Sequence, residues 1–345
     1  MSESVAVVIP THNRSDLLRI TLKNVLCQEG VDLQIAVVDD GSTDDTHEVL
    51  ASLQGDSRFV FHRLDPAGGA CKARNLGVSL TDAPYVCYLD ADDLLHPEKL
   101  ARQVEVLKQD SEVDLAVCQM AHFEVDPNEA TLLWNTFAGA EPRLRFLGHD
   151  PVWGMHAPLW RRTTLDRIGG LDETLPMAQD YEFHTRALLM GCRAHLSLEL
   201  LTYCRRHAGP AIGSAKNIKR IDTLLNVFDG FAEHASSEPE RSILSGNYLW
   251  LGNYSSIRGE GAAMMRAIKR AQSLLGATTW QFTTFSALSH LALKSRRHRF
   301  YAMARDLARR MGADLASRED WFLRHTIADE PGIEVFPMPG SCWQV

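Results

Sequence analysis

Two aspartates separated by one residue follow a short apolar segment, and this spacing suits cation binding. Asp90 and Asp92 come directly after Tyr85–Leu89, which has the composition of a buried strand. On extended chain, side chains at positions i and i+2 point to the same side. Two such carboxylates can share Mg²⁺ or Mn²⁺, ions that prefer oxygen ligands and commonly bind substrate phosphates. The alternative is that Asp92 and Asp93 only cap the helix that begins near Pro97.

A second acidic pair, Asp39 and Asp40, also follows a segment with the composition of a strand. Ser42 or Thr43 can cap the helix predicted at Thr46–Leu53, and a capping role also accounts for Asp44. That role leaves the two aspartates at the strand end, where a carboxylate can accept an N–H group from a nucleobase.

A pair of glycines, Gly68 and Gly69, precedes a short helix that carries Lys72 and Arg74. Glycine lets the backbone approach a ligand closely, and a helix N-terminus favours anions. The motif is neither a Walker loop nor a dinucleotide fingerprint. A turn followed by a solvated basic helix face explains it equally well.

The alternation of strand and helix patterns over the first 120 residues predicts the scaffold that positions these clusters. Val5–Ile9 has a strand pattern that Pro10 is expected to end, and Ser15 is expected to cap the next helix. Such alternation is typical of βαβ units and indicates an α/β fold with a mostly parallel sheet and flanking helices. Ligands bind at the carboxyl ends of such strands, so Thr11–Arg14 should share one edge with both acidic clusters.

The length of 345 residues favours two domains, at roughly 100–200 residues each. We place them at 1–215 and 216–345, because the second part has mostly helical patterns, such as Met264–Leu275 and Phe300–Met311, before an extended tail. Residues 1–215 carry 19 Lys/Arg and 31 Asp/Glu, net −12, whereas residues 216–345 carry 17 and 13, net +4. The acidic first part argues against nucleic acid as a partner, because phosphate binding needs a basic surface.

Cysteine usage and the lack of targeting patterns predict a cytoplasmic protein. The seven cysteines include no CxxC pair and lie within apolar patterns, which is typical of free thiols in a reducing compartment. No Cys/His cluster has zinc-ligand spacing, which argues against a zinc site. The N-terminus lacks a basic signal region, and no apolar run reaches the ~18–20 residues of a membrane span. Thr279–Arg299 is aromatic and amphipathic with a basic end, so it suits either the inner face of a membrane or packing onto the first domain.

Four motifs, taken together and in order, resemble the inverting glycosyltransferases of family two, which have the GT-A (Rossmann-like) fold. The resemblance extends across roughly residues 1–210. It implies a nucleotide-diphosphate-sugar donor, most often UDP-linked, and Mn²⁺ or Mg²⁺ as cofactor. The motifs are Pro10-Thr-His-Asn-Arg14, Asp39-Asp-Gly-Ser-Thr-Asp44, Ala73-Arg-Asn-Leu-Gly77 and Leu89-Asp-Ala-Asp-Asp93.

The resemblance also assigns roles to matched positions. Asp92 would hold the metal with Asp90, which could instead contact the ribose. Tyr203-Cys-Arg-Arg-His207 resembles a further element of the family that approaches the diphosphate and would make His207 an additional metal ligand, although a solvated basic loop explains it about as well. The remaining donor contacts would come from Pro10, Thr11, Asn13, Arg14, Asp39 or Asp40, Arg74, Ala91 and Arg205.

Asp180 matches the family's catalytic carboxylate, within Met177-Ala-Gln-Asp-Tyr-Glu182. The family usually has Glu before this Asp, where this chain has Gln179. A carboxylate near a helix N-terminus is expected to stay ionised and can take the proton of an acceptor hydroxyl. The alternative is that Asp180 is only the N-cap of its helix. Glu182 faces elsewhere on that helix.

The expected function is inverting transfer of a sugar to an acceptor hydroxyl, in glycan or cell-surface polysaccharide biosynthesis. The acceptor stays open between a lipid-linked glycan, a peptide and a small molecule. One alternative is a nucleotidyltransferase, but Thr11–Arg14 lacks the glycines expected after its first strand. The other is a non-catalytic module that binds sugar nucleotides, which the presence of both Asp92 and Asp180 disfavours.

Overall fold

The fold was analysed in a computed structural model, which describes residues 2–206, 220–275, 326–327 and 332–344. The expected helix at Phe300–Met311 and the amphipathic segment Thr279–Arg299 lie outside these ranges, so the membrane contact expected of the latter stays a prediction. The strands are β1 (Glu3–Thr11), β2 (Val31–Asp39), β3 (Phe59–Arg63), β4 (Tyr85–Tyr88), β5 (Leu94–Leu95), β6 (Leu115–Phe123), β7 (Leu132–Leu133), β8 (Pro158–Arg161), β9 (Ala194–Arg205) and β10 (Glu334–Val335).

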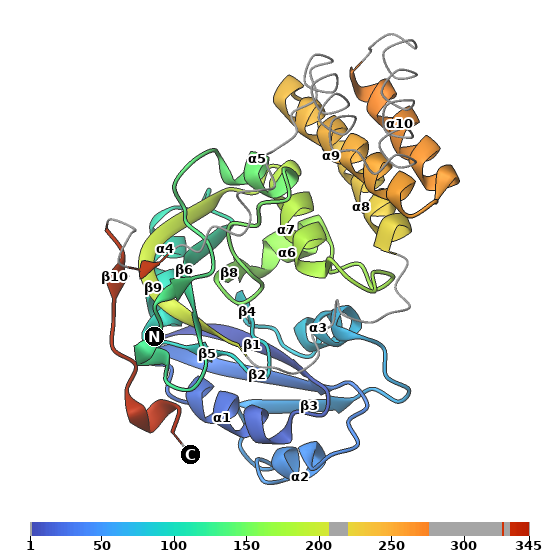
Figure 1. The fold of residues 1–345 in the computed structure, drawn as a ribbon. Coiled ribbons are helices and arrows are strands. Elements are labelled where there is room, and N and C mark those ends of the chain that lie inside the picture. Colours follow the sequence, from blue (N-terminus) through green and yellow to red (C-terminus); the bar gives the residue numbers. More distant parts are fainter. Residues whose placement is uncertain (1, 207–219, 276–325, 328–331, 345) are drawn as a thin grey trace.

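One mixed sheet forms the centre of the protein, with the strand order β10-β9-β6-β8-β4-β1-β2-β3. β1, β2, β3 and β4 pair in parallel, as do β6, β9 and β10, while β8 runs antiparallel to both of its neighbours. This confirms the predicted α/β fold with a mostly parallel sheet and flanking helices (Figure 1). The helices are α1 (Ser15–Val25), α2 (Thr46–Ala51), α3 (Ala70–Ser79), α4 (Lys99–Gln109), α5 (Pro142–Leu147), α6 (Arg162–Ile168), α7 (Gln179–Leu189), α8 (Arg220–His234), α9 (Glu238–Ile257) and α10 (Gly261–Leu275).

Alternate residues of β1 face two separate cores, which makes the N-terminal half a three-layer structure. Val5, Val7 and Ile9 pack with apolar residues of α1, α2 and α4. Ala6 and Val8 point the other way, into a core shared with α3, α5, α6 and α7. Because both faces of the sheet are covered, its central strands are continuously apolar.

The prediction that Pro10 ends the first strand is wrong, because β1 continues in register with β2 through Thr11. The Val8 carbonyl accepts the Leu89 N–H (3.0 Å), so Val8 and, by the two-residue period, Pro10 face the β4 side. β4 ends at Tyr88, opposite Val8. The N–H that proline lacks would therefore have no strand partner, and the strand tolerates it.

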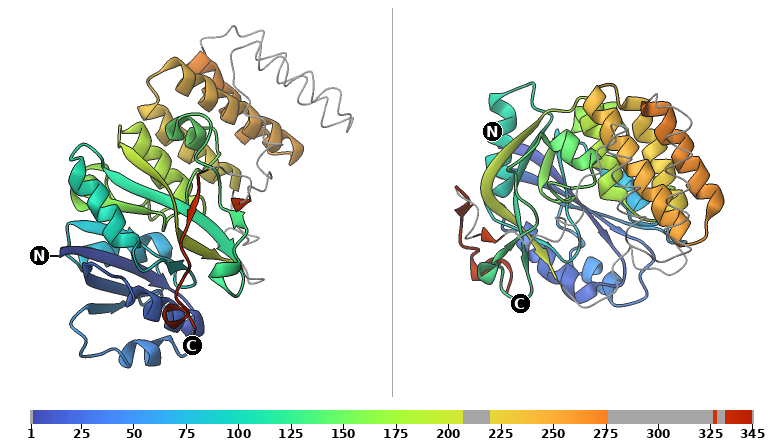
Figure 2. Two further views of the ribbon diagram at one scale, coloured as in Figure 1. Left: turned by 90° about the vertical axis from the view of Figure 1, so that its left-hand side faces the viewer. Right: turned by 45° about the horizontal axis from the view of Figure 1, so that its top comes forward.

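Helices α8, α9 and α10 pack together and lie beside α5 and α7 (Figures 1 and 2). Their shared core includes Phe228, Leu244 and Tyr248, and it reaches the first part of the chain through Leu147 and Tyr181. The mostly helical character predicted for this region is confirmed for residues 220–275. The proposed boundary at residue 215 falls within 207–219, outside the described residues.

The last described segment, residues 332–344, runs along the sheet rather than with the helical layer. Figure 2 shows it passing from β9 toward α1. β10 pairs in parallel with β9, and Met338 and Cys342 are buried in a core with β5 and β6 residues. The tail therefore adds to the N-terminal half, although the boundary drawn from sequence assigns it to the second.

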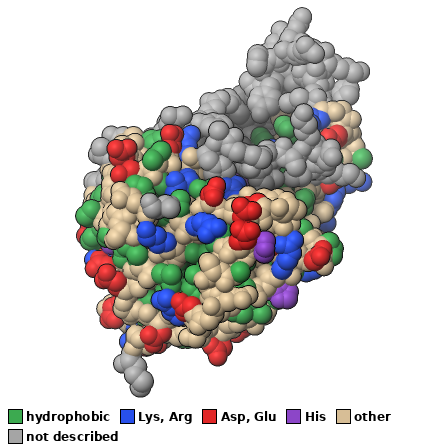
Figure 3. All heavy atoms as spheres, turned by 90° about the horizontal axis from the view of Figure 1, so that it is seen from below, with side chains coloured by type: hydrophobic (Ala, Val, Ile, Leu, Met, Phe, Trp, Pro, Cys, Tyr) green, Lys and Arg blue, Asp and Glu red, His purple; other side chains and the backbone are tan. Residues whose placement is uncertain are grey.

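The surface in Figure 3 has acidic and basic side chains intermingled over the face that it displays. Within the described ranges, the structure has no helix that combines the length and apolar character needed to cross a membrane.

Candidate functional site

A cavity of about 1230 Å³ opens at the carboxyl ends of the parallel strands. The edge predicted from the strand alternation is therefore the edge that carries the cavity, because parallel strands deliver their following loops to one side. The segments that line it are 10–17, 68–71, 90–93 and 173–176, together with Asp40, Asp44, Arg74, Gln179, Cys204 and Arg205.

The loop after β1 is held to the loop after β2 by side chains that were expected to cap helices. The Asn13 backbone N–H donates to Ser42 Oγ (2.9 Å), and the Thr43 N–H donates to Asn13 Oδ1 (2.7 Å). Asp44 Oδ2 accepts the Ser15 N–H (2.9 Å). Ser15 is not the cap, because α1 begins at Ser15 itself and Arg14 occupies the N-cap position. The capping roles predicted for Ser42 and Thr43 are also wrong, because both instead fix Asn13, which has a left-handed φ of 52°.

The adjacent aspartates Asp39 and Asp40 have different surroundings. Asp39 is buried, does not line the cavity, and accepts from the Ser42 N–H (2.8 Å) and from Arg63 (2.6 Å). Asp40 lines the cavity, and its carboxylate accepts the N–H groups of Gly68 and Gly69. The glycine loop is therefore fixed by Asp40, and of the two aspartates only Asp40 is at the cavity surface.

Asp90 and Asp92 meet at the cavity wall, but not on extended chain as predicted. They lie in a turn, in which the Asp93 N–H donates to the Asp90 carbonyl (3.2 Å). Each carboxylate pairs with an arginine. Asp90 Oδ1 lies 2.5 Å from Arg74 Nη2, and Asp92 Oδ2 lies 2.6 Å from Arg14 Nη1. The burial of Asp90 raises its pKa, but the charges of Arg74, His156 and Arg14 and the hydrogen bond from Arg74 together hold the pKa below its usual range.

Arg74 is a buried cation at the cavity wall, with only 4% of its side chain exposed. Burial alone would lower its pKa, but the charges of Asp90 and Asp180 raise it, so the side chain stays charged. Its Nε and Nη1 atoms have no hydrogen-bond partner among the described residues. Buried donors without partners are costly, which makes these two atoms suited to receive an anionic ligand.

Asp180 is the second residue of α7, which begins at Gln179 after Ala178 in a left-handed conformation. Gln179 lines the cavity, whereas Asp180 is half-buried and is not among the lining residues. Burial raises the pKa of Asp180 and the nearby Arg74 lowers it, with burial the larger effect. Desolvation thus opposes the ionised form expected at this helix N-terminus, whereas the charge of Arg74 favours it. Glu182 pairs with Arg186 and points elsewhere, as predicted.

Asn75, next to Arg74 in α3, has a role that the sequence analysis did not assign. Its Nδ2 donates to the Leu171 carbonyl and to Glu173 (both 2.9 Å), and its Oδ1 accepts the Leu171 N–H (2.9 Å). It thereby joins α3 to the loop that leads to α7. The only sequence signal for this residue was its place in the motif Ala73-Arg-Asn-Leu-Gly77.

Three other predicted donor residues, Pro10, Thr11 and Ala91, also line the cavity. Thr11 Oγ1 is buried without a hydrogen-bond partner among the described residues. Arg205 lines the cavity too, where its guanidinium stacks 4.4 Å from the centre of the Phe123 ring and its Nε donates to the Asp92 carbonyl (3.1 Å). The predicted metal ligand His207 lies outside the described residues.

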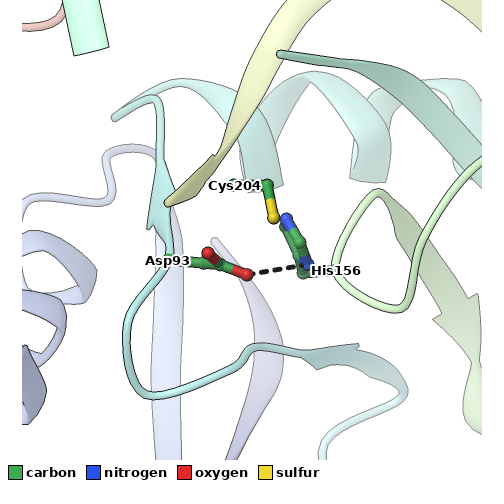
Figure 4. Close-up of side chains that lie close together, drawn as sticks. All are labelled: Asp93, His156 and Cys204. Atoms are coloured by element: carbon green, nitrogen blue, oxygen red, sulfur yellow. Dashed lines mark ion pairs between the residues drawn. The ribbon is translucent and has the colours of Figure 1, made fainter. Parts of the chain in front are cut away.

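Behind the Asp90–Asp93 turn, the fold brings together three groups that are far apart in sequence: Asp93, His156 and Cys204 (Figure 4). No sequence spacing indicated this cluster. Burial raises the pKa of Asp93 and that of the Cys204 thiol, and lowers that of His156 to about 4.

The model of the family described as glycosyl transferase family 2 matches residues 6–164. The succinoglycan biosynthesis protein ExoU of Rhizobium meliloti (strain 1021) is 29% identical over 203 residues, which is 55% of this chain and 58% of that protein. The chondroitin synthase of Pasteurella multocida (strain Pm70) is 26% identical over 223 residues, which is 64% of this chain and 22% of that protein. The matches thus span less than two thirds of these relatives.

Solved structures show the same fold. S. aureus TarS 1–349 in complex with UDP-GlcNAc has a TM-score of 0.62 at 19% identity, and the match covers 91% of this chain and 93% of that one. The mannosyltransferase PcManGT from Pyrobaculum calidifontis, in complex with GDP-Man and Mn²⁺, has a TM-score of 0.52 at 21% identity and covers 93% and 88%.

Proposed function

We propose that the protein, whose residues 6–164 match the model of glycosyl transferase family 2, moves a sugar from a nucleoside-diphosphate donor to an acceptor hydroxyl, with inversion at the anomeric carbon. The observation that carries the proposal is Arg74. Its side chain places two buried hydrogen-bond donors, Nε and Nη1, without partners among the described residues at the wall of the cavity, which the carboxylates of Asp90 and Asp92 also line.

The donor binds across the ends of β1, β2 and β4 in this proposal. The base and ribose lie against Pro10, Thr11 and Asn13, with Asp40 rather than Asp39 on the base side, because Asp40 is at the cavity surface. Arg14, Arg74 and Arg205 approach the diphosphate. The similarity of fold to TarS, solved with UDP-GlcNAc, supports a UDP-linked donor. PcManGT, solved with GDP-Man, makes GDP-sugars the second class to test.

A divalent ion fits the carboxylates of Asp90 and Asp92. Both line the cavity, all their side-chain ligand atoms are oxygens, and 37% of the Asp90 side chain is exposed. Hard cations such as Mg²⁺ and Mn²⁺ prefer such ligands. When bound, the ion supplies positive charge that stabilises the diphosphate as it leaves. We propose that Asp92 is the principal ligand and that Asp90 and His207 support it.

Asp180 acts as the general base in this scheme. It takes the proton of the acceptor hydroxyl, whose oxygen forms a bond to the anomeric carbon while the bond to the diphosphate breaks on the opposite side. The pKa of Asp180, raised by burial, makes it a stronger base than an exposed aspartate. Arg74 limits this rise and keeps the carboxylate form accessible.

The acceptor enters beside 173–176 and Gln179 in this proposal, because these residues line the side of the cavity nearest α7. The names of the relatives, a succinoglycan biosynthesis protein and a chondroitin synthase, support a role in polysaccharide biosynthesis.

A donor screen tests the proposed function. Purified protein is incubated with Mn²⁺ or Mg²⁺ and a panel of UDP- and GDP-sugars, and the release of nucleoside diphosphate is measured with and without glycan acceptors. Release that depends on the metal and on one donor supports the proposal. Binding without release would identify a sugar-nucleotide-binding module. Turnover that requires a nucleoside triphosphate and a sugar phosphate would identify a nucleotidyltransferase.

A further inference from the structure

We propose that Asp93, His156 and Cys204 form a second metal site, buried behind the donor site, that takes a zinc-type cation. The three side chains offer a carboxylate oxygen, an imidazole nitrogen and a sulfur, and these ligand atoms all lie within 4.8 Å of one another. Figure 4 shows Asp93 and Cys204 both directed toward the imidazole of His156.

The three groups come from different parts of the fold that the sheet holds in place. Asp93 follows the turn after β4, His156 precedes β8, and Cys204 is near the end of β9. The Asp93 Oδ1 atom accepts the Arg205 N–H (2.8 Å), and the Asp93 carbonyl accepts from Thr21 Oγ1 (3.1 Å). A hydrogen bond from the backbone to a ligating carboxylate orients it, as outer partners do in known metal sites.

The spacing between the oxygen and nitrogen ligands agrees with tetrahedral coordination. Asp93 Oδ2 lies 3.2 Å from His156 Nδ1. Zinc binds N and O ligands at about 2.0–2.1 Å, so neighbouring ligand atoms of a tetrahedron are about 3.3 Å apart. Although the two atoms are close, their alignment does not meet hydrogen-bond geometry, and Nδ1 has no hydrogen-bond partner among the described residues. Two ligand atoms of one ion are likewise close together without a hydrogen bond between them.

His156 is only 3% exposed, and its Nε2 atom also lacks a hydrogen-bond partner in the described part of the chain. A buried polar group without a partner loses its hydration and gains nothing in return, at a cost of about 1–3 kcal/mol. A bound ion removes that cost at one ring nitrogen. The absence of a hydrogen bond at either ring nitrogen of this buried imidazole, among the described residues, is thus a second observation that points to a ligand.

The ligand chemistry separates this site from the one at Asp90 and Asp92. Thiolate and imidazole ligands select zinc-like ions, whereas carboxylates alone suit Mg²⁺ and Mn²⁺. Asp93 and Cys204 also line the main cavity, so an ion has a route to the site and a fourth ligand can come from the solvent.

Cobalt(II) replaces zinc in such sites and makes the thiolate bond visible, so the test needs no sugar substrate. Chelator-treated protein is titrated with Co²⁺, and the near-ultraviolet absorption of sulfur-to-cobalt charge transfer is recorded. We expect one equivalent of Co²⁺ to produce this absorption in the wild type and zinc to abolish it by competition. Cys204→Ser should lose the absorption, and His156→Ala should weaken Co²⁺ binding at least about tenfold, the lower end of the loss when a metal site is perturbed.

Two variants serve as controls. Cys27→Ser removes the other half-buried thiol of the described chain and should keep the absorption. Asp92→Asn should also keep it, which separates this site from the proposed donor metal. The absence of charge transfer in folded wild-type protein, or its persistence in folded Cys204→Ser, overturns the proposal. Circular dichroism establishes that each variant is folded.

Discussion

At the residue scale, Arg74 connects the two groups on which the proposed chemistry depends. It pairs with Asp90 at 2.5 Å and also acts electrostatically on Asp180. A single buried guanidinium thus influences a proposed metal ligand and the proposed base. Because charges interact more strongly in a buried site than in water, substitution of any of these three residues should affect the others.

Asp180→Asn should reduce sugar transfer by about 10²–10⁴-fold, the usual contribution of a general base. An amide does not accept a proton at neutral pH, so transfer is lost, while donor affinity changes little because the proposed base acts on the acceptor hydroxyl and not on the donor. Transfer rates and nucleotide titration calorimetry give the two readouts. If Asp180→Asn transfers normally and Glu182→Gln does not, the base has been misassigned.

Asp92→Asn should abolish the metal dependence of UDP binding while the protein remains folded. The substitution removes the carboxylate charge that we propose as the main ligand of the ion. The measurement is UDP affinity with Mn²⁺ and with a chelator. Asp16→Asn, an exposed position at the rim of the same cavity, is the matched control and should behave as the wild type. Equal UDP affinity with and without metal in the wild type would contradict the assignment.

The pH dependence of transfer should follow the ionisation of Asp180. A base must be deprotonated, so kcat/KM should rise as the pH rises through its pKa. The burial of Asp180 shifts that rise above the ordinary aspartate value of 3.8. Because Arg74 lowers this pKa, Arg74→Gln should move the rise to higher pH, and Arg74→Lys should move it less. A rise at the same pH in all three proteins would exclude this coupling.

At the scale of elements, helix α3 lies close against the sheet because Gly77 has no side chain. A Cβ atom at this position would lie 2.4 Å from Val8 Cγ1 of β1. The close approach lets α3 carry Arg74 to Asp90 and Asn75 to the loop before α7. The positions of the Arg74–Asp90 pair and of the loop before α7 thus both depend on the contact between Gly77 and Val8.

Gly77→Ala should lower the free energy of unfolding. Overpacking of this kind costs about 1–3 kcal/mol, more than the gain of about 1 kcal/mol in helix propensity. Gly230→Ala in α8 is the control, because a Cβ there meets nothing within 4 Å and should stabilise the protein slightly. Urea denaturation measures both. If the two substitutions changed the free energy of unfolding equally, α3 would be able to move away from β1 without loss of stability.

At the scale of the whole molecule, the two ends of the described chain are joined. Met338 exchanges two backbone hydrogen bonds with the Asn128 side chain (2.7 and 3.0 Å), and Asn24 of α1 contacts its sulfur. Asn24 also bonds both backbone groups of Leu95 in β5. The tail thus supports the strand that follows the Asp90–Asp93 turn.

Met338→Ala should destabilise the protein by about 2–5 kcal/mol, as expected when a buried side chain is truncated. Met338 is 2% exposed, whereas Val335 in β10 is 55% exposed. Val335→Ala should therefore change stability by no more than about 0.5 kcal/mol. Equilibrium unfolding followed by tryptophan fluorescence compares them. If both substitutions lower the free energy of unfolding equally little, the tail does not contribute to the folded core.

Sequence alone determined the fold class and the edge of the sheet at which the cavity lies. Both follow from local patterns: apolar strands alternate with amphipathic helices, and the parallel arrangement delivers the loops after β1, β2 and β4 to one side. The residues in these loops, such as Thr11, Asp40 and Asp92, could therefore be found from their positions after strands.

Only the tertiary structure decided which group each of these residues contacts. The pairing of Asp92 with Arg14, the placement of Asp40 rather than Asp39 at the cavity, and the meeting of Asp93 with His156 and Cys204 all join segments distant in sequence. The raised pKa of Asp180 has the same origin, since burial depends on what packs around a group. Local patterns set the backbone direction of a segment, whereas contacts and dielectric surroundings arise from the packing of the whole chain.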